Sequence, residues 1–292
     1  MIKASTLLSA LLFPVVLCAA QGPVQLQYLT EQPVLQTSSV HIRVKHDDGH
    51  STHDVAEQEM QARLVIDNGG QQRAIVKPPV EVTFDLESLK VGTEAKGKSV
   101  SFDSRNPGTS PFMTEISKIV GKPMQVTVGE DLRVNAKSKE FVKLLQSLER
   151  LGGFRAGNLV SEMFQHLFAL AGEQLQVGQE YTHHLALGAD QSIPVEVTYK
   201  IAAITDTEVR ATITGGFDEV EIAKVSIGNQ GATGEQKLKL AGDIKGKAVW
   251  SRKNALIYKT RVDYTYEGSL SDGKQEVPIH VKLRHKDTTK AL

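Results

Sequence analysis

One stretch of the chain, residues 138–172, carries the only sustained helical pattern, and strand patterns flank it on both sides. Ser138 is a suitable N-cap, and apolar residues then recur at helical spacing until Gly152 and Gly153 end the helix. A second helix is predicted to begin at Asn158, with an apolar stripe wider than one buried face needs. That width predicts burial on two sides or a lid over something apolar. The plainer alternative is a helical hairpin that closes the core of a β-rich domain.

The flanking segments alternate apolar and polar residues, as residues 40–45 and 277–284 illustrate. Strands with one wet face favour a curved antiparallel sheet over a parallel core. Asp67-Asn68-Gly69-Gly70 predicts a hairpin whose return strand, from Ala74, is bent at Pro78-Pro79. The polar tail from Lys286 is predicted to fray. The expected fold class is therefore α+β and mostly β, with a half-barrel-like antiparallel sheet in two halves around a central helical hairpin.

The first residues predict a secretory signal, with Lys3 before a short apolar run and small residues before Gln21. Cleavage is expected after Ala20, which gives a periplasmic or secreted protein. The alternative is a lipoprotein anchored through Cys18. No further apolar run is long enough to predict a membrane span in the mature chain. The expected organisation, in one or two domains, is a signal peptide (1–20), an N-terminal β-rich half (21–137), the helical hairpin (138–172) and a C-terminal antiparallel β half (173–292).

Charge and cysteine content narrow the function classes. The chain has 34 basic and 34 acidic residues, which are interspersed, so nucleic acid is not an expected partner. Cys18 is the only cysteine, so a mature chain that begins at Gln21 has no thiol for a disulfide, a nucleophile or a metal. No protein partner is indicated.

A histidine- and aspartate-rich segment, His46 to Asp54, is the one place where a metal ligand set is concentrated. His46, His50 and His53 would bind zinc or copper through their imidazoles. The alternative is a polar hairpin loop that turns at Gly49, because the spacing matches no closed structural zinc pattern. No other cofactor is expected.

Catalytic motifs are missing from the sequence: it contains no nucleophile elbow, zinc helix motif, P-loop or dinucleotide glycine pattern. His183 and His184 lie in a predicted strand and so face opposite ways, while His166 lies at the edge of the apolar helix. We therefore expect a protein that is not an enzyme.

Several short segments are similar to a family of exported bacterial β-rich proteins known only as a domain of unknown function. They are Val100 to Ser104, Ile116 to Val128, Leu175 to Gly178, and Gly246 to Trp250 followed by Asn254 to Leu256. This chain departs from the family in the Asn254-Ala255 turn, where glycine is usual, and at Tyr181, where tryptophan is common. The resemblance implies no catalytic residues. A looser likeness, of architecture only, is to periplasmic lipid and lipoprotein carriers of the LolA and LppX type.

Three functions stay open at this point. The first is binding of an apolar small molecule or lipid beneath the helices, which the wide apolar stripe of the second helix suggests. The second is a structural or protein-interaction module of the cell envelope with a filled core, and the third is a hydrolase without a recognisable motif. The residues predicted to contact the ligand are Met163, Phe164, Phe168, Tyr264 and Tyr266.

Overall fold

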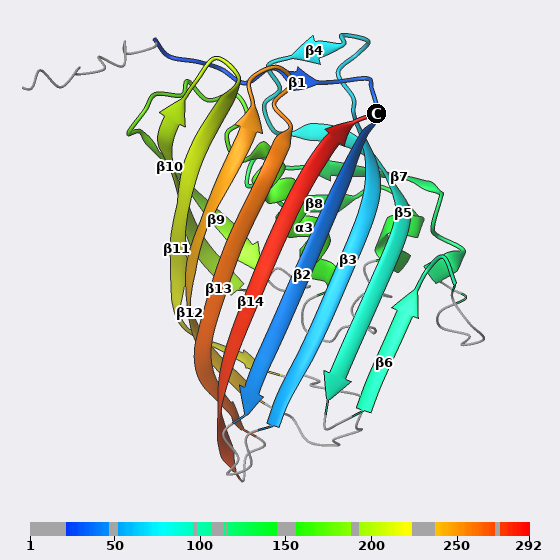
Figure 1. The fold of residues 1–292 in the computed structure, drawn as a ribbon, viewed down its shortest axis with the longest axis vertical. Helices are drawn as coiled ribbons and strands as arrows, with labels where there is room; N and C mark the ends of the chain where they lie inside the picture. Colours follow the sequence, from blue (N-terminus) through cyan, green and yellow to red (C-terminus); the bar gives the residue numbers. More distant parts are fainter. Residues whose placement is uncertain are drawn as a thin grey trace, which may run out of the picture.

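A computed structural model describes residues 22–46, 52–95, 98–106, 114, 116–144, 156–187, 193–223, 237–271 and 275–292. Strands dominate, as the alternation predicts, and one twelve-stranded antiparallel sheet contains nearly all of them (Figure 1). Its first members in the chain are β2 (Val34–His46), β3 (Thr52–Ile66), β5 (Val80–Ala95), β6 (Lys98–Asp103), β7 (Pro123–Val128) and β8 (Val134–Ala136). The rest are β9 (Glu180–Leu187), β10 (Ile193–Ile204), β11 (Glu208–Ala223), β12 (Lys237–Ser251), β13 (Ile257–Ser271) and β14 (Glu276–Ala291).

The order across the sheet is β8-β7-β5-β3-β2-β14-β13-β12-β11-β10-β9, and β6 pairs with the far end of β5. Strands from before and after the helical stretch therefore form one sheet, joined where β2 pairs with β14 from Val34↔Ala291 to His46↔Ile279. The two edge strands β8 and β9 do not pair with each other, so the sheet is open rather than a barrel.

The curvature of the sheet follows from which strands touch the central helix, α3 (Ala156–Phe168). Phe164 of α3 contacts Phe84 of β5, and His166 contacts Tyr199 of β10, seven strand positions further along the sheet. In a flat sheet those strands would lie about 34 Å apart, far more than the roughly 10–12 Å diameter of a helix. The sheet therefore curls around α3, which lies on its concave side (Figure 1). The predicted fold class, a mostly β protein with a half-barrel-like antiparallel sheet, is confirmed.

The end of the chain differs from the prediction. Residues 286–291 do not fray but complete β14, where Asp287 and Thr289 are buried. The inward positions of β14 change from aliphatic to polar after Leu283, and this polar run suggested a tail although the two-residue period continues.

The connection between β3 and β5 also differs. The predicted turn is present, with positive φ at Gly69 and Gly70, but Ala74 pairs with Tyr28 instead of returning along β3. The two-residue strands β1 (Tyr28–Leu29) and β4 (Arg73–Ala74) form a separate small sheet. Pro78-Pro79 separates this excursion from β5, because two consecutive residues without an N–H cannot extend the hydrogen bonds of β3.

The helical stretch follows the prediction at its start. Ser138 accepts a hydrogen bond from the backbone N–H of Phe141 at 3.3 Å, and residues 139–144 are helical. Residues 145–155, which include the predicted Gly152-Gly153 end, lie outside the described residues. The second helix, α3, begins two residues before the predicted cap Asn158. All residues from 162 to 171 are buried, so the C-terminal part of α3 is enclosed on every side and not only along one stripe.

Candidate functional site

The apolar residues of α3 pack against rings that reach it from separate parts of the chain. The ring of Phe168 stacks on that of Tyr28 at 5.5 Å, and the ring of Phe164 lies 6.1 Å from that of Phe84. The Tyr28 hydroxyl also donates a hydrogen bond to the Leu167 carbonyl at 2.9 Å, near the C-terminal end of the helix. Met163, which was predicted to contact a ligand with Phe164 and Phe168, is fully buried on the same helix. These three side chains form part of the packed core around α3.

The concave face of the sheet is divided along the central strands into two chemically different halves. Since directly paired residues share one face, the inward positions can be followed from strand to strand. Toward the C-terminus of β14, they form a polar half that consists of Gln36, Ser38, His285, Asp287 and Thr289. Toward the start of β14, they form an apolar half that consists of Val40, Ile42, Val44, Ile279, Val281, Leu283, Tyr264, Tyr266, Ile244 and Leu240.

Tyr264 and Tyr266, also predicted to contact a ligand, lie within the apolar half. Their rings stack at 6.1 Å, and the ring of Phe217 lies 5.5 Å from Tyr266. Gly242 makes room for this arrangement, because a Cβ there would lie 2.4 Å from the Tyr266 ring. The absence of a side chain at Gly242 thus leaves space on the sheet for the aromatic rings.

The apolar half extends well past α3. Glu162 of the helix faces His285 of β14, and α3 begins only six residues earlier, which is at most about 9 Å of helix. From His285, β14 continues for nine residues to Glu276, which is about 30 Å of strand. The helix therefore covers no more than about a third of this length, although Val281, Ile279 and Tyr266 are buried.

The polar half meets the polar side of α3 in a cluster formed by Glu162, His166, His285 and Asp287, all of which are at most 3% exposed. The two ring nitrogens of His285 lie between the carboxylates: Nδ1 is 3.0 Å from Glu162 Oε2, and Nε2 is 3.0 Å from Asp287 Oδ1. His285 therefore forms an ion pair with each of the two carboxylates.

Two further side chains hold the cluster from outside. The Tyr199 hydroxyl contacts His166 Nδ1 at 2.8 Å, and the Ser38 hydroxyl donates to Asp287 Oδ1 at 2.5 Å. On the other side of these same residues, His166 Nε2 and Asp287 Oδ2 are buried without a hydrogen-bond partner. Burying a polar atom without a hydrogen-bond partner costs free energy, so the presence of two such atoms in one cluster requires a physical explanation.

The pKa values of the two histidines are shifted in opposite directions. Burial, only partly offset by Asp287, lowers the pKa of His166 to about 4, so its imidazole is neutral near pH 7. Burial also opposes a charge on His285, but Asp287 and Glu162 outweigh it and raise the pKa of that imidazole well above its usual value. Burial likewise acts to raise the pKa of Asp287, yet His285 holds it below its usual value. Within the cluster, His285 therefore forms an imidazolium–carboxylate pair with Asp287.

Sequence reasoning did not find this cluster. It treated His166 as a helix-edge residue and overlooked Glu162, His285 and Asp287. The signal was the two-residue period of β14, which puts residues 285 and 287 on the same face as Leu283. Carboxylates and histidines converge here as a hydrolytic site requires, but their side chains are out of reach of solvent.

The predicted metal-binding loop is not described by the structure. His50 lies outside the described residues, while His46 and His53 belong to the ends of β2 and β3, where only the backbone is described. Zinc or copper binding by these three histidines stays a prediction.

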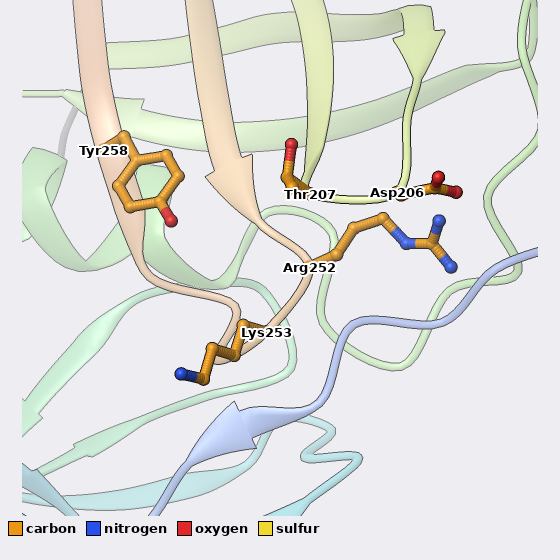
Figure 2. A pocket seen from close by; sticks show the side chains of 5 residues that line it. All are labelled: Asp206, Thr207, Arg252, Lys253 and Tyr258. Carbon is orange, nitrogen blue, oxygen red and sulfur yellow. The ribbon is translucent and has the colours of Figure 1, made fainter.

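A depression of about 380 Å³ opens on the surface where the β10–β11 and β12–β13 turns meet. Figure 2 shows the side chains of Asp206, Thr207, Arg252, Lys253 and Tyr258 around it. Arg252 is fixed to the neighbouring turn, because its Nη1 donates to the Thr205 carbonyl at 2.6 Å. All five side chains are solvent-accessible in part, so the depression has cationic groups but no desolvated ones with which to hold a ligand tightly.

These features define a class of protein: an open, curved antiparallel sheet that encloses the helix α3 on its concave side. No family model and no curated protein sequence matches the chain, so the predicted resemblance to a family of unknown function stays a prediction. None of the described helices is long and apolar enough to cross a membrane.

Two solved structures give low similarity. One, described as "Lipid-protein interactions in lipovitellin", has 10% identity and a TM-score of 0.49, with 90% of this chain and 25% of that chain covered. The other is the botulinum neurotoxin serotype C1 binding domain, with 7% identity, a TM-score of 0.16, and 90% and 84% covered. The chain thus spans about a quarter of the lipovitellin chain, and similarities of this size carry no argument about function.

Proposed function

We propose that this chain is an exported, non-catalytic protein that binds an apolar or amphipathic ligand, such as an acyl chain, on the apolar half of the concave face. One observation carries the proposal: the inward rows of β14, β13 and β12 stay apolar over about 30 Å beyond His285, and α3 covers only a part of them. A core that served α3 alone would not need apolar rows of this length.

The composition of the face suits such a ligand. Aliphatic side chains from β2 and β14 lie next to the stacked rings of Tyr264 and Tyr266, which offer a broad apolar contact surface. The cluster of Glu162, His285 and Asp287 lies at one end of the same face. A polar end beside an apolar run matches an amphipathic molecule better than a plain hydrocarbon. Because the apolar residues are buried without a ligand, binding would require the part of the chain over them to move.

The packing around α3 favours a second candidate, a structural or protein-interaction module whose core is full. The rings of Tyr28, Phe84, Phe164 and Phe168 pack at 5.5–6.1 Å with no room for a ligand between them. In that case the apolar half is core as well, and the protein binds no small molecule there.

Ligand binding can separate the two candidates. The protein would be purified from cells that export it and analysed by native mass spectrometry and by organic extraction. It would then be titrated with dansyl-labelled undecanoic acid, with palmitate as competitor. We expect a co-purified acyl species or a saturable fluorescence rise that palmitate reverses.

A matched pair of variants locates the site. Val44 is half-buried in the apolar half, so Val44→Trp would fill the space of the ligand and weaken probe binding about tenfold or more. Arg43→Trp adds the same ring on the exposed face of the same strand and should leave binding unchanged. If the wild-type protein carries no lipid and binds neither probe nor palmitate, the ligand-binding proposal is wrong and the second candidate replaces it.

A further inference from the structure

The buried cluster brings three possible metal ligands close together. His166, His285 and Asp287 each offer one donor atom, and these donors all lie within 4.8 Å of one another. His166 comes from α3, whereas His285 and Asp287 come from alternate positions of β14, so helix and sheet contribute to the same point. Two imidazoles and a carboxylate are a donor set suited to zinc and related divalent ions.

Each of the three side chains is held on its other side, as metal ligands usually are. His166 Nδ1 contacts the Tyr199 hydroxyl, His285 Nδ1 contacts Glu162, and Asp287 Oδ1 accepts from Ser38. These contacts leave His166 Nε2 and Asp287 Oδ2 without a hydrogen-bond partner, while His285 Nε2 lies 3.0 Å from Asp287 Oδ1. Such outer partners fix the ring orientation and the tautomer of a metal-binding histidine.

Charge balance also favours a cation. The Glu162 and Asp287 carboxylates lie 3.0 Å from the two ring nitrogens of His285, and all three side chains are at most 3% exposed. A buried charge without compensation is strongly unfavourable. A divalent ion at this point would lie beside both carboxylates, and it would give partners to the unpaired His166 Nε2 and Asp287 Oδ2 atoms.

We propose that His166, His285 and Asp287 bind one divalent transition-metal ion, for which Zn²⁺ is the probe, and that Glu162, Tyr199 and Ser38 position these ligands. In tetrahedral zinc sites donor atoms lie about 3.4 Å apart, so the ligands would move inward from their metal-free separation of up to 4.8 Å. Three protein ligands leave one coordination position, which a water molecule would fill. The ion joins α3 to the centre of the sheet.

Because the cluster is buried, the metal should enter while the chain folds. The full protein would be unfolded in guanidinium with a chelator, freed of both, and refolded with or without Zn²⁺. Zinc would then be measured by mass spectrometry after dialysis. We expect one zinc per chain after refolding with Zn²⁺, slow exchange with added chelator, and a higher unfolding midpoint than in the zinc-free protein.

Variants distinguish ligands from positioning residues. His166→Gln and Asp287→Asn should remove stoichiometric zinc, while Glu162→Gln should weaken zinc affinity by about 10–100-fold. His184→Gln is the matched control, because His184 is exposed on β9 outside the cluster. The double variant His50→Ala, His53→Ala tests the other histidine-rich segment and should keep its zinc. Circular dichroism would check the fold of every variant.

Two results would overturn the proposal: a folded wild-type protein that holds no zinc, or ligand variants that retain it. If the variants fail to fold, Co²⁺ in the wild-type protein decides the matter. One equivalent should give the visible absorption of a low-symmetry site and shift the imidazole proton resonances of His166 and His285. A spectrum of hydrated Co²⁺ alone would exclude the site.

Discussion

His183 and His184 are neighbours in β9 but have opposite surroundings, as expected for successive residues of a strand. His184 is exposed near Glu196, whereas His183 is half-buried, with its ring 5.8 Å from that of Tyr199. Burial lowers the pKa of His183 below its ordinary value of 6.5, despite a hydrogen bond to the Ala169 backbone and the charge of Glu173. His184 opposes protonation as well. Protonating His183 therefore costs more in the folded protein than in the unfolded chain.

This difference predicts an acid-sensitive contribution to stability. Because the folded pKa lies below the unfolded one, the contribution is complete above about pH 6.5 and is lost as the pH falls below that value. His183→Gln should reduce the loss of urea midpoint between about pH 7.5 and about pH 5, while His184→Gln should not. Equal losses in the wild-type protein and His183→Gln would contradict the assignment.

For single residues, the sequence predicted burial and exposure better than it predicted which side chains contact one another. The opposite faces of His183 and His184 followed from the strand period alone. The cluster of Glu162, His166, His285 and Asp287 did not, because its members are far apart in the chain and meet only through the packing of α3 on the sheet. No local sequence pattern indicates contacts between residues so far apart in the chain.

Among the elements, β12 and β13 approach each other so closely that they depend on glycine. A Cβ at Gly268 of β13 would lie 1.8 Å from the Lys239 carbonyl oxygen of β12. Gly92 of β5, in contrast, has nothing within 4 Å of its added Cβ. Two strand glycines therefore have opposite roles.

Alanine at the two positions should separate these roles. Gly268→Ala should lower the free energy of unfolding by about 1–3 kcal/mol, because strand backbones must shift to admit the methyl group. Gly92→Ala should be neutral or stabilising by up to about 1 kcal/mol, because it only restricts the unfolded chain. Guanidinium unfolding measures both. A smaller loss for Gly268→Ala than for Gly92→Ala would show that the strands do not meet closely.

Element type was predictable, but element pairing was less so. Alternation located the long strands, and Ser138 located the start of the first helix, because both signals are local. The strand that contains Ala74 was predicted to pair with the wrong strand. Its two-residue pairing with the strand of Tyr28 is too short to give a recognisable pattern in either segment. The last residues of β14 were not predicted as strand for the same reason. Their inward side chains are polar, and the burial of these side chains depends on a distant element.

For the whole molecule, export is the part of the proposed function that can be tested directly. The protein would be expressed with its natural N-terminus in a bacterium and analysed by intact mass spectrometry. We expect the exported form to begin at Gln21, because cleavage after Ala20 follows the apolar run and the small residues. A mass that shows a lipid on Cys18 would establish the anchored alternative, and an unprocessed cytoplasmic chain would contradict export.

The half-barrel shape could be expected from many strands with one wet face, but the joint between its two parts could not. Val34 to His46 and Glu276 to Ala291 carry the same alternation as several other strands. Nothing within either segment selects the other as its neighbour. The order of the sheet is a property of the complete chain.

That joint has a consequence for the order of folding. The pairing of β2 with β14 connects residues 233 to 257 positions apart, from His46↔Ile279 to Val34↔Ala291, so a very long loop must close. Until residue 291 has left the ribosome, β2 lacks its partner and the two parts of the sheet have no common strand pair. The sheet therefore reaches its final form only after β14 has been synthesised. A chain shortened before Glu276 would lose the middle of the sheet and keep two separate groups of strands.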